Sequence, residues 1–291
     1  MNRQTTWRTT WRTTRRWLGV PLRFPGAVAG GLLLLAILAA ALAAAPLAGP
    51  DPLDIAGPPF LWPGEDAAFP LGTDMLGRDI LAGILHGARV SLEIGLLAGL
   101  GATALGLVVG AAAGYFGGWA DQVLMRFAEL FQIMPSLLFT IVLIVVVGPT
   151  LGVIVAGIAV TSWPQVARLV RAEALRLRNS EFILAGIVAG MSDRRILLKH
   201  VVPNVLSPAV VMISILAGNA ILTESALSFL GMGDPNVMTW GNMIGSGREA
   251  LRSAWYMTAI PGLAVLVTVT ALNLLSNGIN DLMNPRRGAW L

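Results

Sequence analysis

Residues 253–280, SAWYMTAIPGLAVLVTVTALNLLSNGIN, contain no charged side chain over 28 positions. A helix needs about 20 consecutive, mostly apolar residues to cross the hydrocarbon core of a bilayer, so this stretch is long enough to span a membrane. The rest of the chain has the same character, since 55% of its 291 residues are hydrophobic and only 12% are charged. Soluble domains carry roughly 25% charged residues. The composition therefore indicates a membrane protein with several spans and excludes a disordered chain.

Five other runs have the length and apolar character of a span. The sequence thus predicts an all-α, polytopic membrane protein with six transmembrane helices, at residues 27–49, 90–114, 130–148, 150–167, 205–230 and 253–280. The regions around them are a basic tail (1–26), a loop between the first two spans (50–89), a core (90–287) that contains a polar segment (168–204), and a short C-terminal end (288–291).

The distribution of basic residues predicts the orientation. Six arginines and no acid lie in the first 26 residues, seven basic side chains lie between the fourth and fifth spans, and Arg286 and Arg287 follow the last span. The loop after the first span instead carries six acids around a single mid-loop arginine, Arg78. Short loops rich in Lys and Arg face the cytoplasm. Both termini and residues 168–204 are therefore expected to be cytoplasmic. Because the basic residues flank spans, they indicate topology and not a nucleic-acid partner.

Residues 71–79, LGTDMLGRD, precede the second span. A glycine turn with Thr73 or Asp74 as a cap, followed by apolar residues at helical spacing, predicts a short amphipathic helix at the outer interface. We interpret this stretch as a structural lead-in to the span, with direct contact to a ligand as the alternative.

The second span carries a ridge of small residues. They recur every four positions, a spacing that lets membrane helices approach closely, and they are Ala98, Ala102, Gly106, Gly110 and Gly114. We expect this ridge to pack against another helix.

The polar segment between the fourth and fifth spans predicts two helices joined by a glycine turn. Ser180 can cap a first helix that Gly190 ends, and Ser192 or Asp193 can cap a second helix that runs to Pro203. Small residues crowd the first helix and its turn: Ala185, Gly186, Ala189 and Gly190. A solvated loop does not need them, whereas a helix that seats in a groove of another protein does. The segment is therefore interpreted as a docking element, with packing on its own bundle as the alternative.

The same segment, EFILAGIVAG at 181–190 followed nine residues later by HVVPN, resembles the "EAA" coupling loop of binding-protein-dependent ABC importer permeases. More narrowly, the chain resembles the C-type permease subunit of the dipeptide/oligopeptide/nickel family. The motifs that carry this resemblance are LGTDMLGRD at 71–79, GARVSL at 87–92, GYFGGW at 114–119, ESALSFLG at 224–231, WGNM at 240–243 and PGL at 261–263. One departure is that Leu184, Ala185 and Gly186 replace Glu-Ala-Ala, which puts one polar contact to the ATPase in doubt.

The resemblance implies a type I ABC importer permease in a bacterial cytoplasmic (inner) membrane. Its partners would be a homologous second permease, two cytoplasmic ATPases that bind ATP and magnesium, and an extracytoplasmic substrate-binding protein. This chain would bind no cofactor and would form half of the path for dipeptides or oligopeptides, with nickel or another small solute as the alternative. The residues expected to couple to the ATPases are Glu181, Ala185, Gly186, Ala189, Gly190, Met191, Ser192, Asp193 and Pro203.

Glu224 is an acid within the fifth span, where a charge is costly and invites a functional interpretation. A structural hydrogen bond is the first interpretation and a place on the translocation path is the second. Asn219, one or two turns away, is expected either to be its partner or to line the same path.

The absence of nucleotide-binding and metal-binding motifs argues against other classes of function. The only lysine is Lys199 and no P-loop is present, so the chain has no such site for ATP, and no enzymatic activity of its own is expected. His86 and His200 are assigned to opposite sides of the membrane and cannot share a metal. A secondary transporter is the rival class, but it predicts internal repeats and ionisable groups at the middle of the membrane, which the sequence does not show.

Overall fold

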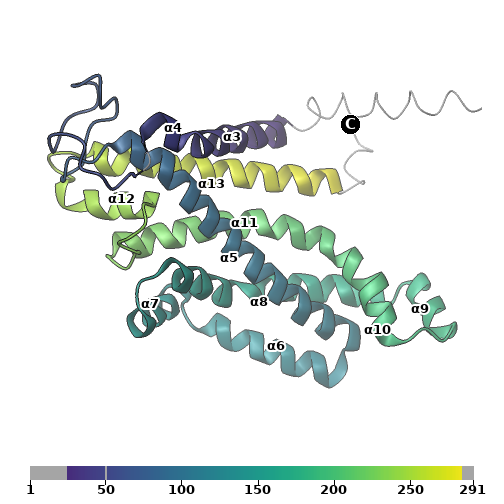
Figure 1. Cartoon of the computed structure of the whole chain (residues 1–291). Coiled ribbons are helices and arrows are strands. Elements are labelled where there is room, and N and C mark those ends of the chain that lie inside the picture. Colours follow the sequence, from purple (N-terminus) through teal and green to yellow (C-terminus); the bar gives the residue numbers. More distant parts are fainter. Residues whose placement is uncertain (1–24, 50, 284–291) are drawn as a thin grey trace, which may run out of the picture.

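The structure, a computed structural model, describes residues 25–49 and 51–283, and the described part is helical (Figure 1). Its only strand-like feature is an isolated bridge between Thr73 and Asp79. The elements are α3 (Pro25–Leu42), α4 (Ala44–Ala48), α5 (Ile80–Phe116), α6 (Gly118–Ile133), α7 (Ser136–Val147), α8 (Leu151–Arg178), α9 (Glu181–Val188), α10 (Asp193–Ile196), the π-helix η1 (Leu197–Val201), α11 (Val202–Phe229), α12 (Trp240–Gly247), the 3-10 helix η2 (Arg248–Ala250) and α13 (Tyr256–Met283). Almost all of the basic tail, and Arg286 and Arg287, lie outside the described residues.

Five helical stretches of the described chain are long and apolar enough to cross a membrane. They are Pro25–Leu42, Ile80–Phe116, Leu151–Arg178, Asp193–Phe229 and Tyr256–Asp281. The pair α6 and α7 passes the same test together but is bent by 81°, so the number of spans reaches six if this pair counts as one. The predicted all-α membrane fold is confirmed, and the third span differs from the others in being broken.

The break in the third span lies at Met134 and Pro135. Proline has no N–H for the helix and disfavours helical geometry at the residue before it. Met134 is accordingly extended, with φ −79° and ψ 126°. The span predicted at 130–148 therefore contains a break near its start, and the bent pair that holds it begins earlier, at Gly118. An apolar run alone does not reveal where a helix bends.

Two other boundaries differ from the prediction because helices continue where the pattern suggested separate pieces, and the cap of α5 is another residue than expected. The amphipathic turns expected as a separate interfacial helix are the first turns of α5 itself. The cap of α5 is Asp79, whose carboxylate accepts from the Leu81 N–H at 2.9 Å, and not Thr73 or Asp74. In the same way, α8 continues through the charged residues 168–178.

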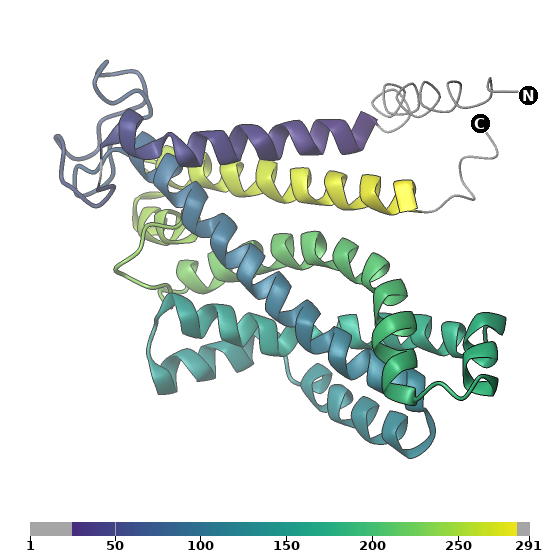
Figure 2. The same ribbon diagram turned by 45° about the vertical axis from the view of Figure 1, so that its right-hand side comes forward.

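Helix α5 lies at the centre of the fold and crosses α8 and α11, while α3 pairs with α13 (Figures 1 and 2). The small-residue ridge of α5 faces α8, as predicted. The two backbones are so close that a methyl group on Gly114 would lie 2.6 Å from the Ala174 Cβ, and one on Gly106 would lie 2.5 Å from the Val166 Cβ. Side chains at these positions would force the helices apart.

The long helices place two regions at opposite ends of the molecule. Helix α9 projects from one end, whereas α12 and the loop 51–79 lie at the other (Figures 1 and 2). The candidate sites are found at these two ends.

Candidate functional site

Helix α9 ends in a tight glycine turn. Gly190 has φ +77°, a left-handed conformation that favours glycine. The Gly190 N–H donates to the Ile187 carbonyl at 2.9 Å, and the Met191 N–H donates to the Gly186 carbonyl at 3.0 Å. This pair of bonds is the Schellman motif, which satisfies carbonyls that the helix end would otherwise leave free. The predicted helix and its glycine stop are confirmed.

The surface of α9 is apolar and exposed in this chain. Ile183 is buried and holds the helix to the bundle. The remaining large apolar side chains are exposed, with Val188 at 89% exposure, and they are Phe182, Leu184, Ile187 and Val188. Such a contiguous apolar surface on a projecting helix is typical of a protein–protein contact.

The segment that carries α9 is fixed to the ends of three long helices. The Tyr115 hydroxyl at the end of α5 donates to the Asp193 carboxylate at 2.7 Å. Arg178 at the end of α8 donates to the Phe116 carbonyl at 3.3 Å. Ile196 is buried in the same core cluster as Ile183. The segment is therefore connected to α5, α8 and α11.

The second helix of the segment does not stop at Pro203, contrary to the prediction. Residues Asp193–Ile196 run through the π-helix Leu197–Val201 directly into α11, with Pro203 in its first turn. Proline inside a regular helix clashes with the carbonyl four residues earlier. The wider π turn precedes this position, and π turns of this kind are frequent at functional sites.

The structure brings the predicted coupling residues together on one end of the molecule. Ser180 and Ser192 occupy the two N-cap positions, although neither side chain makes a capping bond. Gly186 and Met191 lie against each other, since a methyl group on Gly186 would be 3.2 Å from the Met191 Sδ. The other predicted members are exposed: Glu181, Ala185, Ala189, Gly190, Ser192, Asp193 and Pro203.

Glu224 is buried, with 1% of its surface exposed, and joins α11 to α12. Its Oε1 accepts from the Ser228 hydroxyl at 2.8 Å and from the Thr239 hydroxyl at 2.7 Å. Its Oε2 lies against bare Gly241 and has no hydrogen-bond partner among the described residues. Glu224 thus makes the structural hydrogen bonds of the first interpretation. Asn219 is not its partner, because Asn219 is exposed elsewhere on α11. A role of either residue on the path stays a prediction.

The loop 51–79 is anchored by two polar side chains, Thr73 and Tyr256. The sequence pattern suggested Thr73 only as a helix cap and did not single out Tyr256. The buried Thr73 hydroxyl donates to the Pro58 carbonyl at 2.6 Å and accepts from the Leu61 N–H at 3.0 Å. The Tyr256 hydroxyl at the start of α13 lies 2.8 Å from the Leu61 carbonyl and 3.1 Å from that of Thr73. These bonds hold the loop against the helix bundle.

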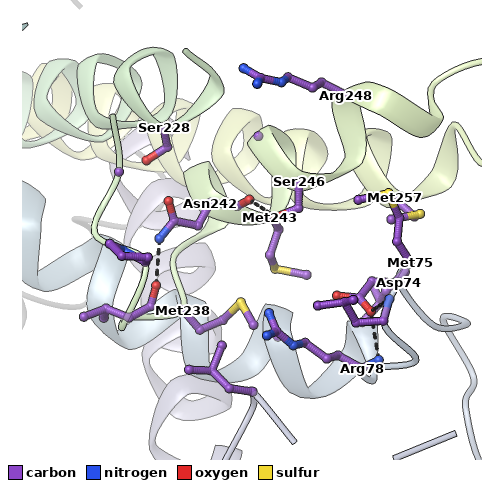
Figure 3. Close-up of a pocket in the computed structure, with 18 of the residues that line it drawn as sticks. Asp74, Met75, Arg78, Ser228, Met238, Asn242, Met243, Ser246, Arg248 and Met257 are labelled. Carbon is purple, nitrogen blue, oxygen red and sulfur yellow. Dashed lines mark hydrogen bonds between the residues drawn. The ribbon is translucent and has the colours of Figure 1, made fainter. Parts of the chain in front are cut away.

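A pocket of about 480 Å³ lies between this loop, the start of α5, the α11–α12 connection and α12 (Figure 3). Its lining includes Arg78 and four methionines, Met75, Met238, Met243 and Met257. In Figure 3 the Arg78 side chain extends beneath Met243 toward Met238, and Arg248 lies on the opposite side. We call this cavity the outer pocket, after the orientation that the basic residues predict.

The described residues contain no group of three or more His, Asp or Glu side chains placed to hold a metal ion. The two histidines lie on different elements. His86 is in α5, with its Nε2 2.8 Å from the Gly49 carbonyl, and His200 is in the π-helix beside α9.

Comparison with known proteins places these features in a family. Residues 106–288 match the family described as binding-protein-dependent transport system inner membrane component. The dipeptide transport system permease protein DppC of Alkalihalophilus pseudofirmus is 37% identical over 224 residues, which cover 77% of this chain and 74% of that protein. The di/tripeptide transport system permease protein DppC of Pseudomonas aeruginosa is 36% identical over 230 residues, covering 79% and 76%. The glutathione transport system permease protein GsiD of Pectobacterium atrosepticum is 37% identical over 224 residues, covering 77% and 74%.

The family match includes the small-residue ridge from Gly106 onward, the whole segment 168–204 that is predicted to couple to the ATPases, and Glu224. Together with the helical membrane fold, it confirms the resemblance drawn from the motifs. The chain belongs to the inner-membrane components of binding-protein-dependent transport systems, the permease subunits of ABC importers.

Proposed function

We propose that this chain forms half of the translocation path of an ABC importer for dipeptides or oligopeptides. Its partners are a homologous second permease, two cytoplasmic ATPases that bind ATP and magnesium, and an extracytoplasmic binding protein that delivers the peptide. The chain itself binds no nucleotide and hydrolyses none. It lies in a bacterial cytoplasmic membrane with both termini in the cytoplasm, so α9 faces the ATPases and the outer pocket faces the binding protein.

The exposed apolar surface of α9 is the observation that carries the coupling role. Within the described residues, Val188 is 89% exposed and Phe182, Leu184 and Ile187 are about half exposed, and the helix projects beyond the bundle. A groove on an ATPase subunit would bury them. Movement of the two ATPases on binding ATP would then displace α9, and the bonds of Asp193 and Arg178 would carry that displacement to α5.

Peptides are favoured as substrates by the names of the relatives. Those names specify dipeptides, di/tripeptides and glutathione, which is itself a tripeptide. Nickel or another small solute is the alternative. Uptake of a labelled dipeptide into vesicles that hold the complete complex and its binding protein distinguishes them, since nickel uptake without dipeptide uptake contradicts the peptide assignment.

Val188→Asp tests the coupling role. A carboxylate on the most exposed apolar position of α9 is expected to release the ATPases during affinity purification and to abolish peptide uptake, because the charge would have to be buried in the contact. Leu251→Asp is the matched control, since it places the same charge on an exposed apolar position at the opposite end. Full retention of the ATPases by the Val188 variant would contradict the docking surface.

Gly190→Trp provides a second test of the same surface. The turn has room around Gly190, but its left-handed φ is strained for any side chain and the indole would stand at the proposed contact. The variant is expected to reach the membrane and to lose peptide uptake. Normal uptake by this variant would remove the support for docking through α9.

A further inference from the structure

Arg78 lines the outer pocket, and no acid among the described residues forms an ion pair with it. Its Nε is buried and makes no hydrogen bond to any described residue, and its guanidinium forms none of the ion pairs found in the described chain. A guanidinium that is partly removed from water is costly unless an anion pairs with it. Its planar donors match a carboxylate, which they bind through two parallel hydrogen bonds.

The two acids nearest in sequence to Arg78 also line the pocket, and each holds the backbone through one carboxylate oxygen. Asp74 Oδ1 accepts from the backbone N–H groups of Leu76 at 2.8 Å and of Arg78 itself at 2.9 Å. Asp79 Oδ1 accepts from the Leu81 N–H at the start of α5. These bonds fix the turn that directs Arg78 into the pocket. They leave the guanidinium available for a carboxylate that comes from outside the chain.

Acidic and basic groups both line the outer pocket, which suits a ligand that carries both charges. Arg248, across the pocket, is engaged with the Phe229 carbonyl at 2.6 Å. Beside it, Glu249 is exposed and offers acceptors for an ammonium group. A free peptide has a carboxylate at one end and an ammonium group at the other.

The methionines give the pocket an adaptable apolar lining. They come from four different segments: the loop 51–79, the α11–α12 connection, α12 and α13. Two of them converge over bare Gly83, where a methyl group would lie 3.1 Å from the Met243 Sδ and 3.8 Å from the Met238 Sδ. Thioether side chains are flexible and polarisable, and surfaces that accept many different partners use them. The cavity of about 480 Å³ is within the range of small-ligand sites, about 300–1,000 Å³.

We propose that the outer pocket binds a short zwitterionic peptide, with Arg78 holding its C-terminal carboxylate and the methionines accommodating its side chains. The proposal rests on the proposed function and identifies a place in the permease where the substrate is held after release from the binding protein. Recognition through the carboxylate and adaptable thioethers would accept peptides of varied sequence.

Photo-labelling of the complete complex in nanodiscs tests the site. The probe is a dipeptide of alanine and p-benzoylphenylalanine, whose excited ketone reacts readily with methionine side chains. Labelling is expected on Met75, Met238, Met243 or Met257. An excess of Ala-Phe should compete for it, whereas the C-terminal amide of Ala-Phe should not, because the amide lacks the carboxylate.

Arg78→Gln is expected to reduce the labelling at least tenfold, as loss of charge-assisted hydrogen bonds typically does. Arg252→Gln is the matched control, because Arg252 is exposed near the same end and does not line the pocket. Arg78→Lys retains the charge and should keep most of the labelling. Size-exclusion profiles and ATPase activity of each variant report on its folding and assembly.

Equal labelling of the wild type and of a folded Arg78→Gln variant would overturn the proposal, as would labelling confined to other residues or to an inserted segment of the binding protein. Uptake into vesicles separates this proposal from the transport function. Peptide uptake without labelling overturns the pocket alone, whereas labelling without uptake supports the pocket and contradicts peptide import.

Discussion

Replacing Glu224 with alanine would remove the acceptor that joins α11 to α12. The hydroxyls of Ser228 and Thr239 are both buried and both donate to its Oε1. A buried polar group left without its partner costs about 1–3 kcal/mol. Because Ser228 can turn its hydroxyl to a carbonyl of its own helix, we expect the two losses to lower the free energy of unfolding by about 2–4 kcal/mol.

Glu224→Gln is the informative companion variant. It keeps an oxygen at the position of Oε1, so both hydroxyls retain an acceptor, and it removes the capacity for negative charge. Denaturant unfolding of the purified permease in detergent, followed by tryptophan fluorescence, should show a much smaller loss of stability than for alanine. Peptide uptake by the glutamine variant should stay near that of the wild type.

Two results would refute this reasoning. An alanine variant as stable as the wild type would mean that the hydrogen bonds of Glu224 contribute nothing to the packing of α12. A glutamine variant of full stability that no longer supports uptake would show that the carboxyl group itself acts in transport, which is the second interpretation of this residue.

Three further predictions concern the helix contacts. Gly110→Ala should lower the free energy of unfolding by about 1–3 kcal/mol, because the new methyl would lie 2.8 Å from the Val170 Cβ on α8. Gly152→Ala is the control, since a methyl group there would have nothing within 4 Å. In the same unfolding assay it should be neutral or stabilising by up to about 1 kcal/mol. Asp121→Asn should lower the free energy of unfolding by about 1–2 kcal/mol, because Arg171 donates to both oxygens of the Asp121 carboxylate, from its Nη2 at 2.6 Å. Unchanged stability would mean that solvent screens this ion pair. Tyr115→Phe should raise amide hydrogen exchange in residues 190–196 by about fivefold, through loss of the bond to the coupling segment, and equal exchange would contradict that anchor.

Features that depend on local sequence were predictable. The apolar runs, the small-residue ridge of α5 and the glycine turn at Gly190 each follow from a pattern within a few helical turns. The helix break at Pro135 was also encoded locally, but the apolar run around it concealed the signal. The position of the cap of α5 was missed for a similar reason, because Thr73, Asp74 and Asp79 all have capping side chains and only the folded loop selects Asp79.

The sequence by itself determined that this chain is a helical membrane protein and a member of its permease family, because span length, apolar composition and motif order are properties of consecutive residues. Only the tertiary structure decided the partners of Glu224, the anchoring of the loop 51–79 by Tyr256, and the meeting of Arg78 with methionines from distant segments. Those contacts join residues far apart in the chain. Their geometry depends on how the long helices cross, and that crossing is set by packing over the whole bundle.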